Sequence, residues 1–204
     1  MPTEREIDEE WAKALEEMGC VVHIFENRHR FANGRVDKKR LSVDDLMSKV
    51  IHAGKLDKRS SVEVTLSPQP AEIEGDELSL VNAITNIVLN GIHWAEEKQG
   101  RHAAKVKVEG SIEQNIFKMS ISDNGPGMTE EVKAKIFELG FTKRENGTGV
   151  GLAETDYVIK QHNGTIEVES ELGKGTTFII KLPLIQDPVV SFQPKTDLLV
   201  EVQL

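Results

Sequence analysis

The sequence has almost no cysteine and few aromatic residues. Of its 204 residues, Cys20 is the single cysteine and 5% are aromatic. One thiol excludes an internal disulfide framework and a multi-thiolate metal site, since both need several thiols. The sequence also lacks any run of about 18 uninterrupted apolar residues, and polar residues rather than a signal peptide follow Met1. We therefore expect a cytoplasmic protein with no membrane contact within this chain.

Positive charge is in deficit as well. The chain carries 34 acidic and 25 basic residues, which gives a net charge of −9. The excess of negative charge argues against attraction to nucleic acid or anionic lipid, so neither is expected as a partner. A phosphate-bearing ligand therefore has to be held by a local group of residues. The hydrophobic content of 38% is typical of a globular chain rather than a disordered one.

The pattern of apolar residues divides the chain into three expected segments. Residues 1–40 carry a seam of six apolar residues at alternating spacings of three and four: Ile7, Trp11, Ala14, Met18, Val21 and Phe25. The seam predicts either a dimerising helix, giving a homodimer through residues 5–31, or an amphipathic helix that packs on its own domain. Residues 41–185 are expected to form one domain, and residues 186–204 a C-terminal extension with a further strand.

Residues 41–185 alternate between two kinds of hydrophobic pattern. Spacings of three and four predict helices at residues 43–53, 77–97, 129–138 and 150–162. Alternation of apolar and polar residues predicts strands at residues 62–66, 106–108, 117–121, 166–168 and 178–182, with a turn over residues 110–115. Strands that follow one another directly favour an antiparallel or mixed sheet, so we expect an α+β fold with helices on one face of one sheet.

A stripe of polar residues runs along the helix expected at 77–97. At about 100° per residue, Asn82, Asn86, Asn90 and His93 fall on one side, opposite the apolar residues. Asparagine is a mediocre helix former, so three of them on one face require a reason. Their carbonyls can hold a hard cation such as Mg²⁺ while their amides face phosphate oxygens. The alternative is a merely polar surface.

Two glycine-bearing segments follow that helix. Asp123, at the end of a strand, precedes Gly125 and Gly127, so a fixed acceptor lies beside a backbone that a flat ligand can approach closely. Residues 147–151 read Gly-Thr-Gly-Val-Gly and lead into a helix, whose N terminus exposes N–H groups suited to phosphate. Alone, the first pattern is also compatible with a simple turn.

A basic loop lies between these glycine segments. Phe137 and Phe141 are four residues apart and can anchor a loop from which Lys143 and Arg144 reach phosphate. Two other phosphate-binding patterns are excluded, because neither the Walker A spacing nor the dinucleotide Gly-x-Gly-x-x-Gly spacing is present.

In this order, the segments resemble the N, G1, F and G2 boxes of the ATP-binding catalytic domain of sensor histidine kinases. The resemblance covers residues 41–183, closes on Gly173-Lys174-Gly175-Thr176-Thr177-Phe178, and extends to the superfamily of gyrase, Hsp90, histidine kinases and MutL. It implies the Bergerat fold, an α/β sandwich whose mixed, mostly antiparallel sheet carries helices on one face. It also implies ATP and Mg²⁺ as cofactors, bound between the polar helix and a lid.

The resemblance implies roles residue by residue. Asn86 and Asn90 match the catalytic N-box pair, with Asn90 as the Mg²⁺ ligand, and Asp123 matches the acceptor of the adenine amino hydrogen. Trp94 is expected either against the purine or in the core. The other expected nucleotide-binding residues are His93, Gly125, Gly127, Met128, Lys143, Arg144, Gly147, Thr148, Gly149, Val150, Gly151, Leu152 and Thr176. His93 departs from the pattern, because the family commonly has lysine or arginine there.

Position 86 separates branches of the superfamily. The hydrolases and the anti-sigma serine kinases place a glutamate there as general base, and the amide of Asn86 cannot take a proton. This favours a histidine kinase, whose acceptor imidazole is already nucleophilic. His23 and His29 do not begin the family's phosphoacceptor motif, so we expect a histidine outside this chain segment as acceptor and a response regulator as partner. The alternatives are an anti-sigma-type serine kinase and a non-catalytic, nucleotide-gated binding module.

Overall fold

The computed structural model describes residues 37–54, 61–66, 70–100, 102–144 and 147–186. The seam expected to dimerise within residues 5–31 and the extension after residue 186 lie outside the described residues. Among the helices that the structure describes, none has the length and apolar character that crossing a membrane requires.

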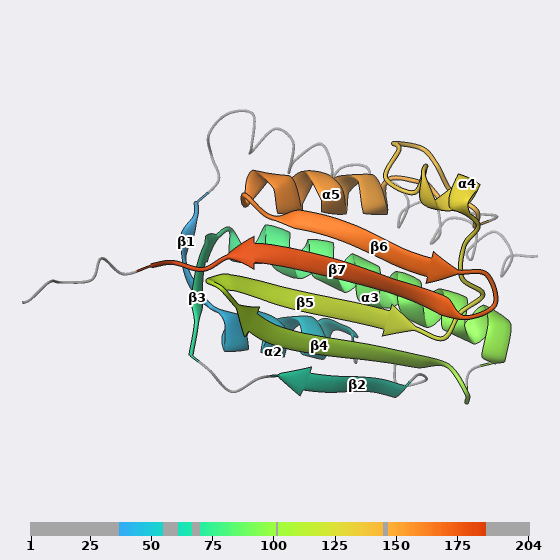
Figure 1. Ribbon diagram of the computed structural model, residues 1–204, viewed down its shortest axis with the longest axis horizontal. Coiled ribbons are helices and arrows are strands. Elements are labelled where there is room, and N and C mark those ends of the chain that lie inside the picture. The colour runs from blue at the N-terminus through green and yellow to red at the C-terminus, as the bar shows by residue number, and fades with distance from the viewer. Residues whose placement is uncertain (1–36, 55–60, 67–69, 101, 145–146, 187–204) are drawn as a thin grey trace, which may run out of the picture.

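The described chain forms a sheet covered by helices on one face (Figure 1). Its elements are β1 (Lys39–Ser42), α2 (Val43–Gly54), β2 (Ser61–Leu66), β3 (Glu72–Gly75), α3 (Glu77–Gln99), β4 (Lys105–Glu113), β5 (Ile116–Asp123), α4 (Glu130–Lys133), α5 (Gly151–Gln161), β6 (Thr165–Glu171) and β7 (Gly175–Pro183). Five strands form a mixed sheet in the order β2-β4-β5-β7-β6, in which β2 and β4 are parallel and the other neighbours antiparallel. The predicted α+β fold is confirmed.

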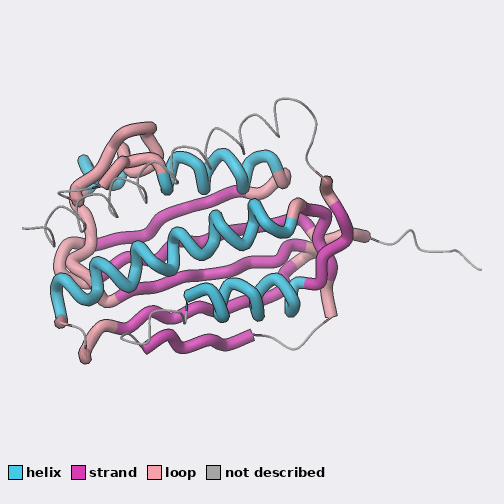
Figure 2. Tube along the Cα trace, turned by 180° about the vertical axis from the view of Figure 1, so that it is seen from behind, coloured by secondary structure: helices cyan, strands magenta, loops and turns pink. Residues whose placement is uncertain are grey.

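The core lies between the sheet and α3, the central helix of the layer seen from behind in Figure 2. Alternation along the strands buries Val106 and Val108 of β4 and Met119 of β5, while α3 buries Ile84 and Val88 against them. The opposite face of the sheet carries charged side chains, including the ion pairs Lys107–Glu109 and Lys181–Glu167. The apolar side predicted for α3 is therefore confirmed.

The first turn of α3 is joined to the last turn of α5 by polar groups. Asp76 caps α3, because its Oδ1 accepts a hydrogen bond of 2.9 Å from the backbone N–H of Ser79. The backbone N–H of Asp76 donates to Nε2 of His162 at 2.9 Å. Nδ1 of His162 lies 2.7 Å from the carbonyl oxygen of Val158 and donates to it, since Nε2 is the acceptor. His162 therefore joins the two helices only in its neutral form.

Three predictions about local structure were wrong or incomplete. The helix predicted at 129–138 is only α4, and the chain continues in tighter turns that bury Ile136 and direct Phe137 onto Phe178. The turn predicted over 110–115 is confined to Gln114 and Asn115, both with positive φ, because β4 and β5 pair up to that point. The sequence pattern missed β1 and β3, which form a separate antiparallel pair of four residues each.

Burial lowers the pKa of His162, so folding stability depends on pH near its ordinary value of 6.5. The folded state resists protonation and the unfolded state does not, so stability is full above pH 6.5 and falls as the pH drops below it. The hydrogen bond to the carbonyl of Val158 and the charge of Asp76 oppose this lowering of the pKa, and the charge of Lys38 adds to it. Urea unfolding of the wild type and His162→Gln between pH 5 and 8 should give a stability difference that shrinks on acidification. A difference that stays constant would contradict this role.

Candidate functional site

The expected site residues gather around one cavity of about 410 Å³. It lies between α3, the loop after β5, the start of β7 and the segment that leads into α5. The lining includes these predicted residues: Asn86, Asn90, Trp94, Asp123, Gly127, Met128, Lys143, Arg144, Gly147, Thr148, Gly149, Val150, Gly151, Leu152 and Thr176. His93 and Gly125 are the two predicted site residues that do not line it. Segments far apart in the sequence thus form one chemical environment.

One end of the cavity contains the carboxylate of Asp123. Its Oδ1 accepts a hydrogen bond of 2.8 Å from the backbone N–H of Gly125 and one of 3.3 Å from the backbone N–H of Thr176. Burial raises the pKa of Asp123 to about 6, against the opposing effects of these two N–H groups and the positive charge of Lys98. At pH 7 the group is mostly ionised, so it is a strong acceptor in a poorly solvated place.

Glycines bring the backbone close to this carboxylate. A Cβ atom added to Gly125 would lie 2.8 Å from Oδ1 of Asp123. One added to Gly91 would lie 3.4 Å from the Cβ of Asp123. Gly127 has a φ of +69°, and a Cβ atom added to it would lie only 2.1 Å from the carbonyl oxygen of Glu171. The loop therefore follows a path that only small residues permit. Gly125 shapes the cavity wall from behind without lining it.

The other end of the cavity is formed by the start of α5. The Cβ of any larger residue at position 151 would lie 2.6 Å from Oδ1 of Asn86, so Gly151 allows α5 to begin directly against α3. Nδ2 of Asn86 donates to the buried Thr155 Oγ1 at 3.2 Å, which fixes this junction. Val150 at the N-cap makes no side-chain capping bond. The N–H groups of the first turn of α5 are therefore suited to an anionic ligand.

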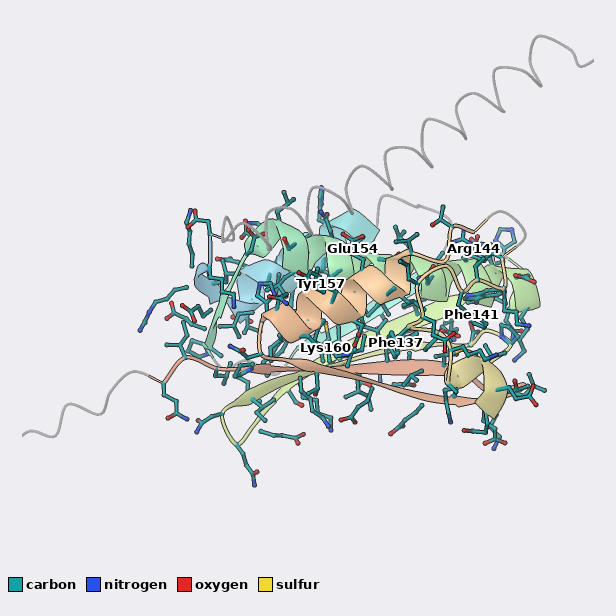
Figure 3. All side chains as sticks on the ribbon, turned by 90° about the horizontal axis from the view of Figure 1, so that it is seen from above. Phe137, Phe141, Arg144, Glu154, Tyr157 and Lys160 are labelled. Atoms are coloured by element: carbon teal, nitrogen blue, oxygen red, sulfur yellow. The ribbon has the colours of Figure 1, made fainter. Side chains whose placement is uncertain are left out.

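The segment before α5 is folded back on itself. The backbone N–H of Gly140 donates to the carbonyl oxygen of Gly149 at 2.9 Å, and Gly149 has a φ of +66°. Figure 3 labels Phe137, which packs edge-on against Phe178 and ties the segment to the sheet, and Arg144, which extends toward α3. This arrangement brings the basic loop to Asn90 of α3.

Asn90 is held by that basic loop. Nη1 of Arg144 donates to Oδ1 of Asn90 at 3.4 Å. The described residues contain no cluster of three or more His, Cys, Asp or Glu side chains that could hold a metal ion. A divalent cation bound here would therefore use the Asn90 carbonyl, water and oxygens of the ligand itself, as Mg²⁺ commonly does with phosphates. The donor set fits Mg²⁺ only together with a phosphorylated ligand.

The remaining aromatic residues lie at the edge of the site. Trp94 is half-buried, lines the cavity and packs edge-on against His93 with ring centroids 5.2 Å apart. His93 lies 3.7 Å from the Glu97 carboxylate instead of lining the cavity. Burial and the nearby Arg144 lower the pKa of His93, so the ring is mostly uncharged at pH 7. The structure thus does not bring His93 into the cavity where a phosphate contact was expected.

Several lining residues were not among the predicted site residues. They are Gly91, Pro126, Thr129, Val132, Ile136, Phe141, Thr142, Leu172 and Phe178. Most are apolar. An apolar residue in a sequence is expected in the core, but the sequence does not show which core residues line a cavity. Thr142 carried a weak signal, since it directly precedes the two basic residues of the loop.

Comparison with known families gives the same result as this geometry. The model of the family described as "Histidine kinase-, DNA gyrase B-, and HSP90-like ATPase" matches residues 75–186. The chain belongs to this family. The match begins at the end of β3 and includes every residue that lines the cavity.

Relatives within this family are sensor kinases of bacteria. Sensor histidine kinase ZraS of Klebsiella oxytoca is 36% identical over 126 residues, which is 61% of this chain and 26% of the relative. Sensor-like histidine kinase SenX3 of Mycolicibacterium smegmatis is 30% identical over 160 residues, 74% of this chain and 40% of the relative. The chain thus spans less than half the length of these curated relatives.

Solved structures confirm the fold. The histidine kinase AdeS of Acinetobacter baumannii has a TM-score of 0.69 at 20% identity, over 91% of this chain and 87% of that chain. The mycobacterial sensor histidine kinase MprB has a TM-score of 0.61 at 24% identity, over 72% of this chain and 97% of that chain. The fold is therefore that of histidine kinase ATPase domains, the predicted Bergerat fold.

The half-buried charge of Asp123 should cost stability in the protein without ligand. Asp123→Asn keeps an Oδ1 acceptor for Gly125 and Thr176 and removes the charge, so we expect unfolding at pH 7 to cost up to about 2 kcal/mol more free energy. Because the pKa is raised in the folded state, the gain should disappear as the pH falls toward 4. Urea titrations with Glu169→Gln on the exposed face as control measure it, and an Asn variant less stable than wild type at pH 7 would contradict it.

Proposed function

We propose that this chain binds Mg-ATP and transfers its γ-phosphoryl group to a histidine outside this chain segment, as the catalytic domain of a two-component histidine kinase. The observation that carries the proposal is that the two ends of one cavity differ in chemistry. A half-buried carboxylate, Asp123, lies at one end, and an uncapped helix N terminus beside two asparagines lies at the other. These ends match the two ends of ATP.

The base would be recognised at the Asp123 end. The carboxylate accepts two backbone N–H groups through Oδ1, and Oδ2 would accept the amino hydrogen of adenine. Gly127 allows the flat ring to approach the loop, and Met128 and Trp94 supply apolar contact. A buried acceptor rejects a base that presents a carbonyl at the same position, because two acceptors would then face each other without a proton.

The phosphates would bind at the start of α5. The residues of the first turn of α5 line the cavity without a side-chain cap, and the helix dipole favours negative charge there. Lys143 and Arg144 add positive charge from the loop. With a net charge of −9 on the chain, this local group provides what the surface as a whole does not.

Magnesium would bind through Asn90. The ion supplies charge neutralisation for the phosphate oxygens, and the amide carbonyl of Asn90 orients it. Arg144 presently donates to that same carbonyl oxygen, so binding requires the guanidinium to leave Asn90. The phosphates offer it a stronger, charge-assisted partner, which makes the exchange favourable.

The geometry supports transfer to a nucleophile that needs no base in this chain. Asp123 is the one carboxylate among the described lining residues, and it lies at the adenine end. The group nearest the start of α5 is the amide of Asn86, which cannot accept a proton. An imidazole is nucleophilic in its neutral form, so positioning of ATP and Mg²⁺ is sufficient.

The partners follow from the same proposal. The acceptor is a histidine-containing domain, and a response regulator would take the phosphoryl group from it. The relatives named as sensor kinases are much longer than this chain, which is consistent with further domains supplying the signal and the acceptor. A cytoplasmic location, where ATP is abundant, fits this role.

The first experiment is a calorimetric titration of the wild type with Mg²⁺ and a non-hydrolysable ATP analogue, followed by incubation with γ-labelled ATP and the acceptor domain of a sensor kinase. We expect saturable binding and an acid-labile label on the acceptor, as phosphohistidine gives. An acid-stable label would identify a serine kinase instead. Binding without transfer would favour a nucleotide-gated binding module, and no binding would contradict the proposed function.

Adenosine binding should weaken at acidic pH. The pKa of Asp123 is about 6, so the carboxylate that accepts the amino hydrogen becomes a donor as the pH falls through that value. Well below it, affinity should fall by about tenfold per pH unit at most. Titration calorimetry with adenosine between pH 5 and 8 measures this, and an affinity that does not change below pH 6 would contradict the role of Asp123.

Asn90→Ala should remove the magnesium-dependent part of ATP binding. Affinity for ATP with Mg²⁺ is expected to fall by about tenfold or more, while adenosine affinity stays within about twofold, because the adenine end is untouched. Asn82→Ala is the matched control, since Asn82 lies on the same stripe of α3 but does not line the cavity. Equal losses of ATP and adenosine binding would contradict a metal role.

A further inference from the structure

The last turn of α3 carries a lysine that bridges two loops of the site. Nζ of Lys98 donates to the carbonyl oxygen of Gly125 at 3.1 Å and to that of Gly173 at 2.7 Å. Gly125 belongs to the loop after β5, and Gly173 belongs to the turn between β6 and β7. One ammonium group thus joins three segments that are distant in the sequence.

The two loops are already joined to each other. The backbone N–H of Gly173 donates to the carbonyl oxygen of Pro126 at 2.6 Å. Added Cβ atoms at Gly127 and Gly175 would lie 2.1 Å from the carbonyl oxygens of Glu171 and Asp123, so the backbones are in close contact. The loop after β5 and the β6–β7 turn therefore form one unit. Two residues at the end of α3 fix the position of this unit: Gln99 donates to the carbonyl oxygen of Asn124 at 3.2 Å, and Lys98 binds both loops.

We propose that Lys98 is a positioning residue of the nucleotide site, which holds the loop after β5 and the β6–β7 turn against α3 and so aligns Gly125 with the carboxylate of Asp123. The inference rests on the proposed function, because the aligned carboxylate is the adenine acceptor. It goes beyond it by assigning the geometry of the adenine end to a residue that does not line the cavity.

The chemistry of the contact supports this role. Two carbonyls that converge on one point repel each other, and an ammonium between them provides the donors that both require. The carbonyl of Gly125 belongs to the residue whose N–H binds Oδ1 of Asp123, so its orientation is passed to the carboxylate through a single residue. A loop released from Lys98 keeps its contacts with the β6–β7 turn and the hydrogen bond from Gln99 of α3 to Asn124, but loses the bond that orients the carbonyl of Gly125.

Lys98 also acts on Asp123 through its charge. Burial raises the pKa of Asp123, and the positive charge of Lys98 lowers it, adding to the larger effect of the N–H groups of Gly125 and Thr176. Loss of the charge would leave more of Asp123 protonated near neutral pH. Geometry and charge therefore change adenine recognition in the same direction.

The neighbouring Lys174 provides a matched control. It lies in the same turn, next to Gly173, and pairs with the exposed carboxylate of Glu171 at 2.7 Å instead of binding the loop after β5. Lys174→Met therefore removes one positive charge from the same region and leaves the bridge intact. Lys98→Arg keeps the charge and the donors.

The test is a titration of the full chain with adenosine between pH 5.5 and 8, using wild type, Lys98→Met, Lys98→Arg and Lys174→Met. Adenosine is chosen because it lacks the phosphates and reports the adenine end alone. For Lys98→Met we expect about fivefold to tenfold weaker binding at pH 7 and a shift of the acid-side midpoint to higher pH. Lys98→Arg, which keeps the charge and the donors in a different geometry, should lose less affinity than Lys98→Met, and Lys174→Met should match wild type.

A second measurement does not depend on the ligand. The carboxyl resonance of Asp123, followed by NMR against pH in the free protein, should titrate at higher pH in Lys98→Met than in wild type and Lys174→Met. Unchanged affinity, midpoint and titration in Lys98→Met would overturn the inference, as would an equal loss in Lys174→Met. Failure of the wild type itself to bind adenosine would instead overturn the proposed function on which the inference rests.

Discussion

The rest of the site depends on keeping one carboxylate ionised inside the protein. Asp123 is largely removed from water, and burial opposes its charge. Two backbone N–H groups and the positive charge of Lys98 compensate for lost hydration. The N–H group of Gly125 comes from the loop that turns back on the carboxylate, and that of Thr176 comes from β7, which starts beside Asp123 directly after the glycine-bearing β6–β7 turn. The glycines of these turns are therefore required by the charge they surround.

The central helix α3 connects this requirement to the fold. Its apolar side covers the sheet, and its other side carries Asn86 and Asn90 at the cavity and Lys98 at its end. A helix is rigid over this length, so the spacing between the two ends of the cavity is set by its rise of about 1.5 Å per residue. Packing of the apolar side against β4 and β5 thus determines the distance between the groups proposed for adenine and for phosphate.

Sequence reasoning found what has a local chemical signature. The asparagine stripe, the Asp-x-Gly-x-Gly segment and the glycines before α5 were all predicted, and so was the mixed sheet. It missed β1 and β3 because four-residue strands have too few residues for an alternating pattern, and it extended α4 because Ile136 and Phe137 continue an apolar spacing. It placed His93 with the phosphate residues because the resembled family commonly has lysine or arginine at that position, whereas the shorter imidazole lies beside Glu97, one turn further along α3.

Lys98 could not be found from the sequence for a different reason. A lysine near the end of a helix is expected from the helix dipole alone, so its presence predicts nothing about a site. Its role arises only when two glycine carbonyls from distant segments converge on it. Asn86 is the opposite case, because what matters is that its side chain is an amide and not a carboxylate. A carboxylate beside the start of α5 could accept a proton from water, and the amide of Asn86 cannot. This difference suits transfer to an external nucleophile better than activation of water.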